Sequence, residues 1–379
     1  MKHRGRFVLS IFIVLATFYS FPIFAQDKPS VVLGGALRFN YNYSDWKPDN
    51  RKRGGDFGYD VFFLNAKASY KKLTLTAEYR FYPSSSGGGM LKYGWIGYQF
   101  NDMHQLQLGL TLVPFGIQPY TGNSYFYNLN FFLGLEDNYK MGLKYLFRKG
   151  PWEMNAAFYK NADVLDFSAN SETSPNRFSY DVGGRNKEVN QGNAQVIYHW
   201  GNEWTQQIGA SAKVGGLYNI DTQKVGLNTA FAAHYGIGYK RWNFKAQYTT
   251  YTMKPVDKDG EDRNKVTMVA YGASYNIAAR ADIYLATLSY TIPFNKGILN
   301  DICFYNDFSI MHKRVKGYNE SYQNVTGCLI GIGPIYTYVD YALGKNQAWL
   351  GKDWNNAFAE GQDSNQWNAR FNINIGYYF

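Results

Sequence analysis

Polar and apolar residues alternate along most of the chain, in segments of about ten residues separated by turn-rich stretches. The clearest segment covers residues 73–81, where Leu73 and Leu75 fall on one face and Glu78 and Arg80 on the other. Because successive side chains of a β-strand point to opposite faces, this pattern predicts strands with one apolar and one polar face. Such strands suit a wall between lipid and water.

The alternating segments number about 16, and boundaries taken from one sequence allow roughly 14 to 18 strands. They predict an all-β fold, a transmembrane antiparallel up-and-down β-barrel. We place the strands near residues 31–43, 59–70, 73–82, 90–100, 104–113, 139–148, 151–160, 190–200, 204–215, 226–239, 242–253, 266–277, 281–292, 300–311, 324–341 and 367–379.

The connections between these segments alternate in length, as expected for short periplasmic turns and longer outside loops. The short connections are residues 71–72, 101–103, 149–151, 201–203, 241 and 278–279. The long connections are residues 44–58, 83–89, 114–138, 161–189, 216–225, 254–265 and 344–366. The alternation weakens late in the chain, where residues 293–299 are short for an outside loop and residues 312–323 are long for a turn.

The first residues predict an export signal. Lys2, Arg4 and Arg6 give a positive start, residues 7–18 form an apolar run, and Ile23-Phe24-Ala25 is the expected cleavage site. We therefore expect residues 1–25 to be a signal peptide and residues 26–379 to form a single barrel domain.

The composition indicates what kind of membrane protein the mature chain is and where it is located. No later stretch offers the roughly 20 consecutive apolar residues of a spanning helix, and the mean hydropathy is −0.40. Aromatic residues make up 18% of the chain, with 34 Tyr, 27 Phe and 9 Trp, which favours a barrel with interfacial aromatic girdles. We expect the protein in the outer membrane of a Gram-negative bacterium, in contact with membrane lipid and lipopolysaccharide and with no nucleic acid.

The end of the chain is an alternating strand that finishes on Phe379. In outer-membrane barrels, a terminal aromatic residue on the last strand is commonly part of the signal that the barrel assembly machinery recognises. A similar strand on a soluble protein would be an exposed hydrophobic edge. We therefore predict that Phe379 is an assembly signal.

The polar faces of the predicted strands carry an excess of basic residues. After loss of the signal peptide, 36 of the 39 basic residues remain against 29 acidic ones, a net charge of about +7. A water-filled channel lined by fixed positive charge favours anions. We predict that the following residues line the lumen: Arg38, Lys67, Arg80, Lys140, Lys144, Arg148, Lys213, Lys245 and Arg370.

Three of these residues recur at four-residue intervals, so Lys140, Lys144 and Arg148 share one face of a strand. They could form a row of cationic steps for an anion, or they could simply solvate a polar lumen. Opposing acidic residues on the same faces are fewer, chiefly Glu78 and Glu153.

The connection at residues 114–138, hereafter the 114–138 loop, is hydrophobic for a loop. An apolar loop exposed to water is unfavourable, so we expect it to fold into the barrel and narrow the channel. Subunit contact or packing on the membrane surface is the alternative. The expected constriction residues are Tyr120, Tyr125, Phe126, Tyr127, Phe131, Phe132, Glu136 and Asp137.

Other chemistry has little support in the sequence. The mature chain contains four histidines, at positions 104, 199, 234 and 312, and none of them is part of a metal-ligand spacing or a nucleophile motif. We predict no metal, no cofactor and no enzymatic activity. Cys303 and Cys328 lie on neighbouring predicted strands, and the sequence leaves a disulfide between them open.

The chain resembles the phosphate-selective porins, the O and P porins, in the form found in Bacteroidetes. The resemblance covers most of the mature chain and is carried by residues 62–70, 73–80, 107–116 and 340–345, including the Pro114-Phe115-Gly116 turn before the 114–138 loop. It implies a 16-stranded trimeric barrel that passes phosphate or related anions through a constriction lined by arginine and lysine.

The chain departs from that pattern, because the 114–138 loop has no Arg or Lys and carries Glu136 and Asp137 instead. The resemblance therefore carries the barrel and the pore, but not the substrate. The leading hypothesis is a passive, weakly anion-selective porin for small solutes such as phosphate, assembled as a homotrimer. The rival hypothesis is a non-conducting surface barrel that serves adhesion or ligand binding through residues 161–189 and 344–366.

Overall fold

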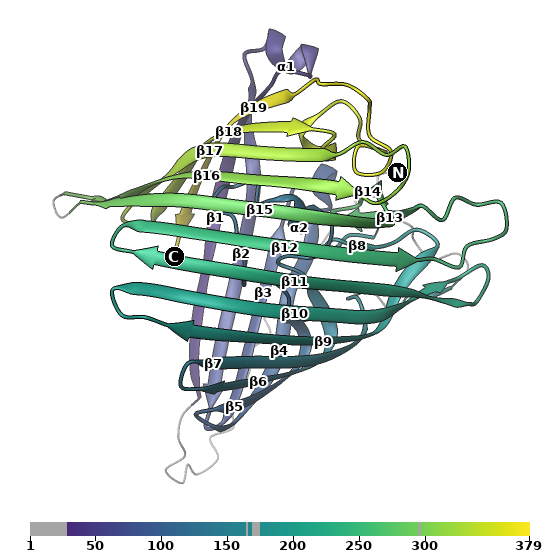
Figure 1. Ribbon diagram of the computed structural model, residues 1–379. Coiled ribbons are helices and arrows are strands. Elements are labelled where there is room, and N and C mark those ends of the chain that lie inside the picture. The colour runs from purple at the N-terminus through teal and green to yellow at the C-terminus, as the bar shows by residue number, and fades with distance from the viewer. Residues whose placement is uncertain (1–28, 164–165, 169–174, 295–296) are drawn as a thin grey trace, which may run out of the picture.

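The computed structural model describes residues 29–163, 166–168, 175–294 and 297–379. In these residues the main sheet is a closed barrel of 16 antiparallel strands, and strands adjacent in the wall follow one another along the chain (Figure 1). The all-β up-and-down barrel predicted from the alternation is confirmed. The predicted signal peptide, residues 1–25, lies outside the described residues.

The barrel strands follow the chain in order around the wall. They are β1 (Ser30–Ser44), β2 (Asp56–Tyr70), β3 (Leu73–Phe81), β4 (Gly89–Asn101), β5 (His104–Leu112), β6 (Tyr139–Lys149), β7 (Trp152–Asn161), β9 (Asn186–Trp200), β10 (Trp204–Asn219), β11 (Val225–Tyr239), β12 (Trp242–Lys254), β15 (Arg280–Pro293), β16 (Leu299–Lys313), β17 (Ser321–Ile332), β18 (Ile335–Lys345) and β19 (Asn368–Tyr378).

The helical segments are short and lie in the loops: α1 (Pro48–Lys52), α2 (Leu129–Phe132) and the 3-10 turns η1 (Ser84–Ser86) and η2 (Ala348–Leu350). Asn128 caps α2, because its side chain accepts a hydrogen bond from the backbone N–H of Asn130. In the part of the chain that the structure describes, no helix is long and apolar enough to cross a membrane.

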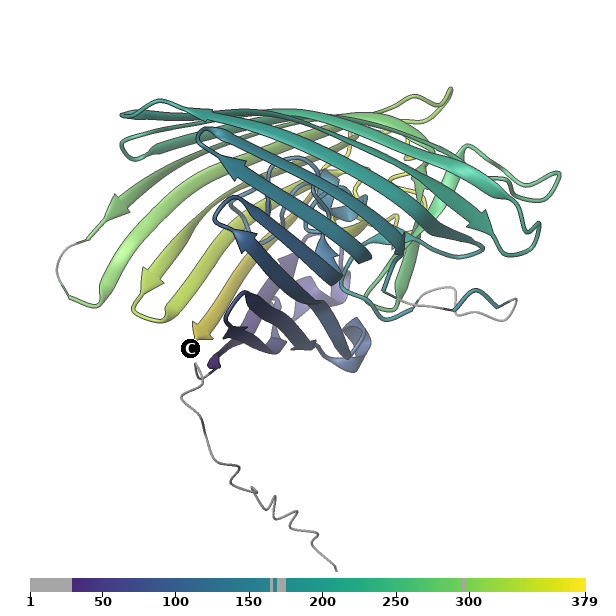
Figure 2. The same cartoon turned by 90° about the horizontal axis from the view of Figure 1, so that it is seen from below.

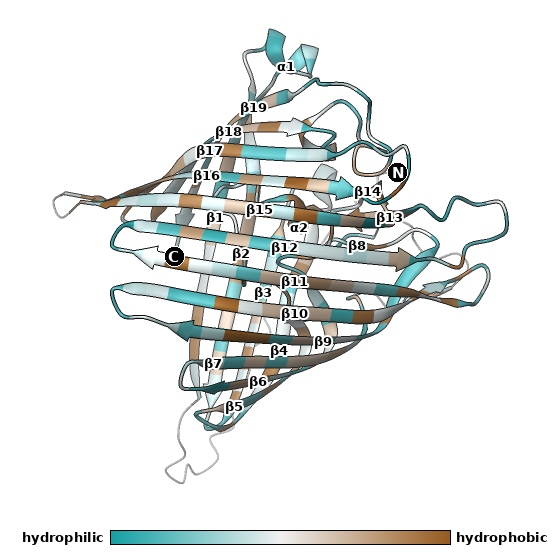
Figure 3. Ribbon diagram, in the orientation of Figure 1, coloured by the Kyte–Doolittle hydropathy of each residue, from teal (hydrophilic) through white to brown (hydrophobic). Residues whose placement is uncertain are grey.

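The barrel wall is apolar outside and polar inside. On β3, Leu73 and Leu75 are 46% and 42% exposed, whereas Glu78 and Arg80 are each only 7% exposed and face the lumen. Figure 3 shows the resulting alternation of hydrophobic and hydrophilic residues along the strands. This inversion of the soluble pattern is what a lipid-facing barrel requires.

The last strand closes the wall against the first, as the adjacent purple and yellow strands show (Figure 2). The β1–β19 register runs from Ala36 opposite Tyr378 to Ser44 opposite Arg370. Beyond it, Gly35 and Phe379 exchange two backbone hydrogen bonds of 3.0 Å. Phe379 therefore takes part in barrel closure.

The expected barrel strand at residues 266–277 is wrong. The segment is a hairpin, β13 (Lys265–Ala270) and β14 (Ala273–Ala278), which joins β8 (Asp181–Val182) in a separate sheet of order β14-β13-β8. Tyr271 and Gly272 form its turn, both with positive φ. The consecutive residues Met268 and Val269 are 1% and 0% exposed, so both faces of this strand are covered by protein and neither meets lipid.

The expected single strand at residues 324–341 is also wrong, because the chain reverses at Gly333 and Pro334 between β17 and β18. Gly333 adopts φ +56°, a left-handed conformation that allows this tight turn. The two errors cancel in the strand count. They also explain the apparent break in loop alternation, because the short connection from Pro293 of β15 to Leu299 of β16 now falls at the turn end of the barrel, and residues 314–320 fall at the loop end.

The two cysteines are free. Cys303 on β16 lies opposite Leu329 on β17, and Cys328 lies opposite Phe304. Because neighbouring residues of a strand point to opposite faces, the two thiols lie on different sides of the wall. The disulfide that the sequence left open does not form.

Candidate pore and constriction

The 114–138 loop lies inside the barrel. Its backbone N–H groups donate to side chains that point inward from the wall: Gly116 to Ser211 (2.8 Å), Ile117 to Gln247 (2.8 Å), Asn123 and Ser124 to Asp307 (both 2.7 Å) and Tyr125 to Asp340 (3.2 Å). These partners come from β10, β12, β16 and β18. The loop is therefore attached along half of the wall and crosses the lumen.

The apolar side of this loop is covered by other loops. Phe131 and Phe132 are each 5% exposed, and their rings contact Tyr180, whose centroid lies 5.0 and 5.7 Å away. Phe132 also stacks on Trp349 and Phe358 from residues 346–367. This aromatic core explains why the loop is so hydrophobic, and it uses the inner sheet that the sequence assigned to the wall.

The other predicted aromatic residues of the loop divide between packing and the lumen. Phe126 is 6% exposed and packs with Trp46 and Leu350, whereas Tyr125 and Tyr127 are half-buried. Tyr120 is 41% exposed although the loop that carries it lies inside the barrel. Tyr120 therefore borders open lumen.

The two predicted acidic residues of the loop are structural partners. Glu136 accepts hydrogen bonds from Asn128 Nδ2 (2.8 Å) and Thr121 Oγ1 (2.9 Å), which hold the two ends of the loop together. Burial raises the pKa of Glu136 to about 7, although these hydrogen bonds oppose the rise. Asp137 accepts from Lys92 Nζ at 3.0 Å and so ties the loop to β4.

The wall opposite the loop anchors carries three close charge pairs. Arg38 lies 2.8 Å from Asp60, Arg80 lies 2.7 Å from Glu78, and Lys92 pairs with Asp137. Asp60 and Lys92 sit at register shifts in the β1–β2 and β3–β4 ladders. A bulge adds a residue to one strand and turns an extra side chain to the same face. Strict alternation in the sequence therefore could not show either residue.

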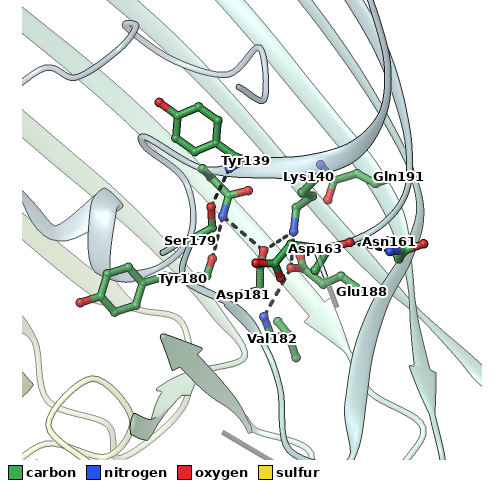
Figure 4. A network of polar contacts seen from close by, with 12 residues as sticks. Tyr139, Lys140, Asn161, Asp163, Ser179, Tyr180, Asp181, Val182, Glu188 and Gln191 are labelled. Carbon is green, nitrogen blue, oxygen red and sulfur yellow. Dashed lines mark hydrogen bonds and ion pairs between the residues drawn. The ribbon is translucent and has the colours of Figure 1, made fainter. Parts of the chain in front are cut away.

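A second polar network ties Asp163, Arg177 and Asp181, which lie between β7 and β9, to the wall (Figure 4). Lys140 bridges the carboxylates of Asp181 and Glu188, the latter at 2.6 Å, while Arg177 pairs with Asp163 (3.0 Å) and Asp181 (3.1 Å). Lys213 approaches Glu188 at 3.6 Å. Two predicted lumen cations, Lys140 and Lys213, are thus buried among carboxylates.

The three basic residues expected to form a row of cationic steps lie on one face of β6, but each of them contacts a polar partner. Lys140 is buried in the network just described, and Lys144 Nζ donates to the Leu112 carbonyl at 3.0 Å. Arg148 lies 3.1 Å from Glu153 at the exposed end of the strand. Each of the three cations has a partner, so the row is not a run of free charges.

The remaining predicted lumen residues face inward, and in the described part of the chain none of them has a carboxylate within ion-pair distance. Arg370 donates to Ser44 Oγ at 3.0 Å and lies over the Trp46 ring, and Lys245 donates to the Thr121 carbonyl at 3.1 Å. Lys67 is exposed on the inner face of β2. Asp307 and Asp340 lie on inward faces too, and the alternation of their strands was the signal that could have identified them.

Within the described residues, no group of three or more His, Cys, Asp or Glu side chains is arranged to hold a metal ion. The site consists instead of loop anchors, paired charges and aromatic rings. This arrangement can restrict and line a passage.

Comparison with known proteins agrees with this architecture. No family model matches the chain, and no curated protein matches it in sequence. Among solved structures, OmpT of Vibrio cholerae in its trimer form aligns at 13% identity with a TM-score of 0.60, covering 93% of this chain and all of that one. The outer membrane channel DcaP of Acinetobacter baumannii aligns at 12% identity and 0.59, covering 93% and 97%.

An anion-selective porin from Comamonas acidovorans aligns at 12% identity with a TM-score of 0.56, covering 93% of this chain and 100% of that one. At these identities the likeness concerns the fold. The chain has the 16-stranded barrel fold of outer-membrane porins, and a closed barrel with an apolar outer face is the architecture of Gram-negative outer-membrane proteins. The predicted outer-membrane location agrees with this architecture.

Proposed function

We propose that the protein is a porin, a passive diffusion channel for small solutes in the outer membrane, and that it is not an enzyme. The observation that carries this proposal is the 114–138 loop, which is fixed inside the barrel while Tyr120 on it remains 41% exposed. A loop that crosses a barrel without filling it narrows a passage.

We further propose a weak preference for anions, phosphate among them. Arg370, Lys245 and Lys67 support it, because they face inward without a carboxylate at ion-pair distance in the described residues. The pairs formed by Arg38, Arg80 and the Lys140 network offset much of the remaining positive charge. A preference far below that of a dedicated phosphate channel follows from this balance.

A homotrimer is part of the proposal. Support comes from the trimer form named for the Vibrio cholerae relative in fold. Assembly through Phe379 and the barrel assembly machinery is proposed from the position of this residue at the seam of the barrel.

Planar-bilayer recording of the purified full chain tests the proposal. We expect stepwise ohmic conductance, and a reversal potential in a KCl gradient that shows slightly greater permeability for Cl⁻ than for K⁺. Cation preference would contradict the anion claim alone. Absence of conductance from correctly folded protein would contradict the channel and favour the non-conducting surface barrel, to which the packed aromatic core of the outside loops lends support.

A further inference from the structure

Tyrosine side chains line the lumen between the 114–138 loop and one arc of the wall, which runs from β18 through β19 and β1 to β4. Besides Tyr120 on the loop, this tyrosine collar comprises residues that are all half-buried and come from the loop, the end of β3, β4, β18 and β19: Tyr82, Tyr93, Tyr127, Tyr338 and Tyr378. The collar brings together segments from both ends of the chain.

Contacts within the collar show that its members face a common space. Tyr120 and Tyr127 meet edge to face at 5.6 Å, and the Tyr338 ring lies 6.4 Å from the Tyr125 ring of the loop. Tyr338 and Tyr378 share the inward faces of β18 and β19 with the buried residues Asp340 and Asn374. Tyr82 and Tyr378 pack against the same small cluster that includes Phe63. An arc of partly exposed phenols therefore borders the passage.

The basic groups at this level are paired with acidic ones. The three basic side chains, Arg38, Arg80 and Lys92, are each paired with a carboxylate at 2.7 to 3.0 Å. A small inorganic anion would have to compete with these carboxylates for the same donors. The collar is thus a poor site for phosphate.

Polar groups of these pairs also reach the phenols. Arg80 donates to the Tyr82 hydroxyl at 3.0 Å, and the Tyr93 hydroxyl donates to Glu78 at 3.1 Å. The passage therefore combines flat aromatic faces with an ordered set of donors and acceptors, in which each of the three basic groups is paired with a carboxylate. Aromatic rings with polar tips offer an apolar surface and hydrogen bonds at the same time.

We propose that the tyrosine collar binds neutral oligosaccharides during their passage. A sugar ring has an apolar C–H face that stacks on a phenol, and a rim of hydroxyl groups that can bond to Tyr, Arg and carboxylate groups. This inference rests on the proposed channel function and gives its solute class. Binding must be weak enough for release, as conduction requires.

Current block by maltotriose tests this inference in planar bilayers containing the full chain. We expect the open-channel current to fall with maltotriose concentration and to saturate. Removing one stacking ring, in Tyr120→Ala or Tyr127→Ala, should raise the half-blocking concentration by about two- to tenfold. Tyr120→Phe keeps the ring and should block nearly as the wild type does.

Tyr341→Ala is the matched control, because Tyr341 is 51% exposed on the outer face of β18 and should leave the block unchanged. A current that falls only in proportion to solution viscosity, or an equal block in Tyr120→Ala, would overturn the collar site while leaving the channel intact. Saturable block by inorganic phosphate with none by maltotriose would also overturn it. Absence of any conductance would overturn the channel and this inference together.

Discussion

The guanidinium of Arg38 on β1 lies 2.8 Å from the carboxylate of Asp60, which a register shift in the β1–β2 ladder turns into the lumen. The Asp60 carboxylate also accepts hydrogen bonds from the Tyr125 hydroxyl at 3.1 Å and from Asn374 at 2.9 Å. This one acidic group therefore joins the first strand, the last strand and the 114–138 loop, and it neutralises a cation beside the passage.

Neutralising this acid should make the channel more anion-selective. In Asp60→Asn the Arg38 charge loses its partner, so we expect the Cl⁻ to K⁺ permeability ratio to rise by about two- to fivefold. The reversal potential in a KCl gradient measures it. Arg38→Gln should shift the ratio in the opposite direction, and the double variant should return close to the wild type. Equal ratios in all four proteins would show that this pair lies outside the ion path.

Loss of the Asp307 anchor should loosen the 114–138 loop. Asp307 accepts two backbone hydrogen bonds of 2.7 Å from Asn123 and Ser124 and a third of 2.9 Å from the Asn123 side chain. Asp307→Ala leaves both N–H groups without their acceptor, at a cost of about 1–3 kcal/mol each where they stay dry. We expect noisier and larger single-channel currents and faster proteolysis within residues 114–138.

Asp301 provides the control for that experiment, since it lies on the same strand near the short-turn end. Asp301→Ala removes the same charge without touching the loop and should leave current noise unchanged. Matching behaviour of the two variants would contradict a specific anchoring role for Asp307.

Attachment of the loop should depend on pH through Glu136. Burial raises the pKa of this carboxyl from 4.5 to about 7, so between these values the folded protein binds a proton that the unfolded chain does not. The stabilisation from the protonated form is complete below about pH 4.5 and is lost as the pH rises to 7, by up to about 3 kcal/mol.

Thermal unfolding in detergent at pH 5 and pH 8 measures this effect. We expect a higher midpoint at pH 5 for the wild type, and a smaller difference for Glu136→Gln, which cannot ionise. Undiminished pH dependence in that variant would assign the effect to other groups.

Much of the fold could be predicted from the sequence because lipid and water impose a period of two on every strand of the wall. The hairpin at residues 265–278 was not recognised, because polar and apolar residues also alternate in parts of its sequence. It differs from a wall strand in that protein covers both of its faces. The Gly333-Pro334 turn escaped because it is only two residues long. Both features depend on tertiary packing, which one sequence does not display.

The sequence could predict which basic side chains point into the lumen, but not which acidic side chains pair with them. Arg38 and Arg80 face inward as expected from alternation, yet the bulge residue Asp60 and Asp181 of the two-residue strand β8 bring in carboxylates that oppose lumen cations. A bulge breaks the alternation, and a two-residue strand is too short to show it. The sequence therefore overstated the positive character of the lumen.

Removing the terminal ring should impair assembly more than folding. The Phe379 backbone exchanges two hydrogen bonds with Gly35, and any Cβ at Gly35 would come within 2.8 Å of the Phe379 ring, so the ring lies directly over this glycine. Phe379→Ala keeps the backbone bonds. We expect the purified variant to fold into detergent like the wild type but to reach the outer membrane at a severalfold lower level, as judged by heat-modifiable mobility on gels.

Phe371→Ala is the matched control, because Phe371 is an aromatic residue of the same strand and the same outer face, eight positions before the terminus. It should assemble at close to the wild-type level, since it is not the terminal residue. Equal losses for both variants would mean that the last strand needs aromatic bulk in general, and the terminal residue would then have no separate role. A defect of Phe379→Ala in detergent folding as well would make the ring a structural closure element rather than an assembly signal.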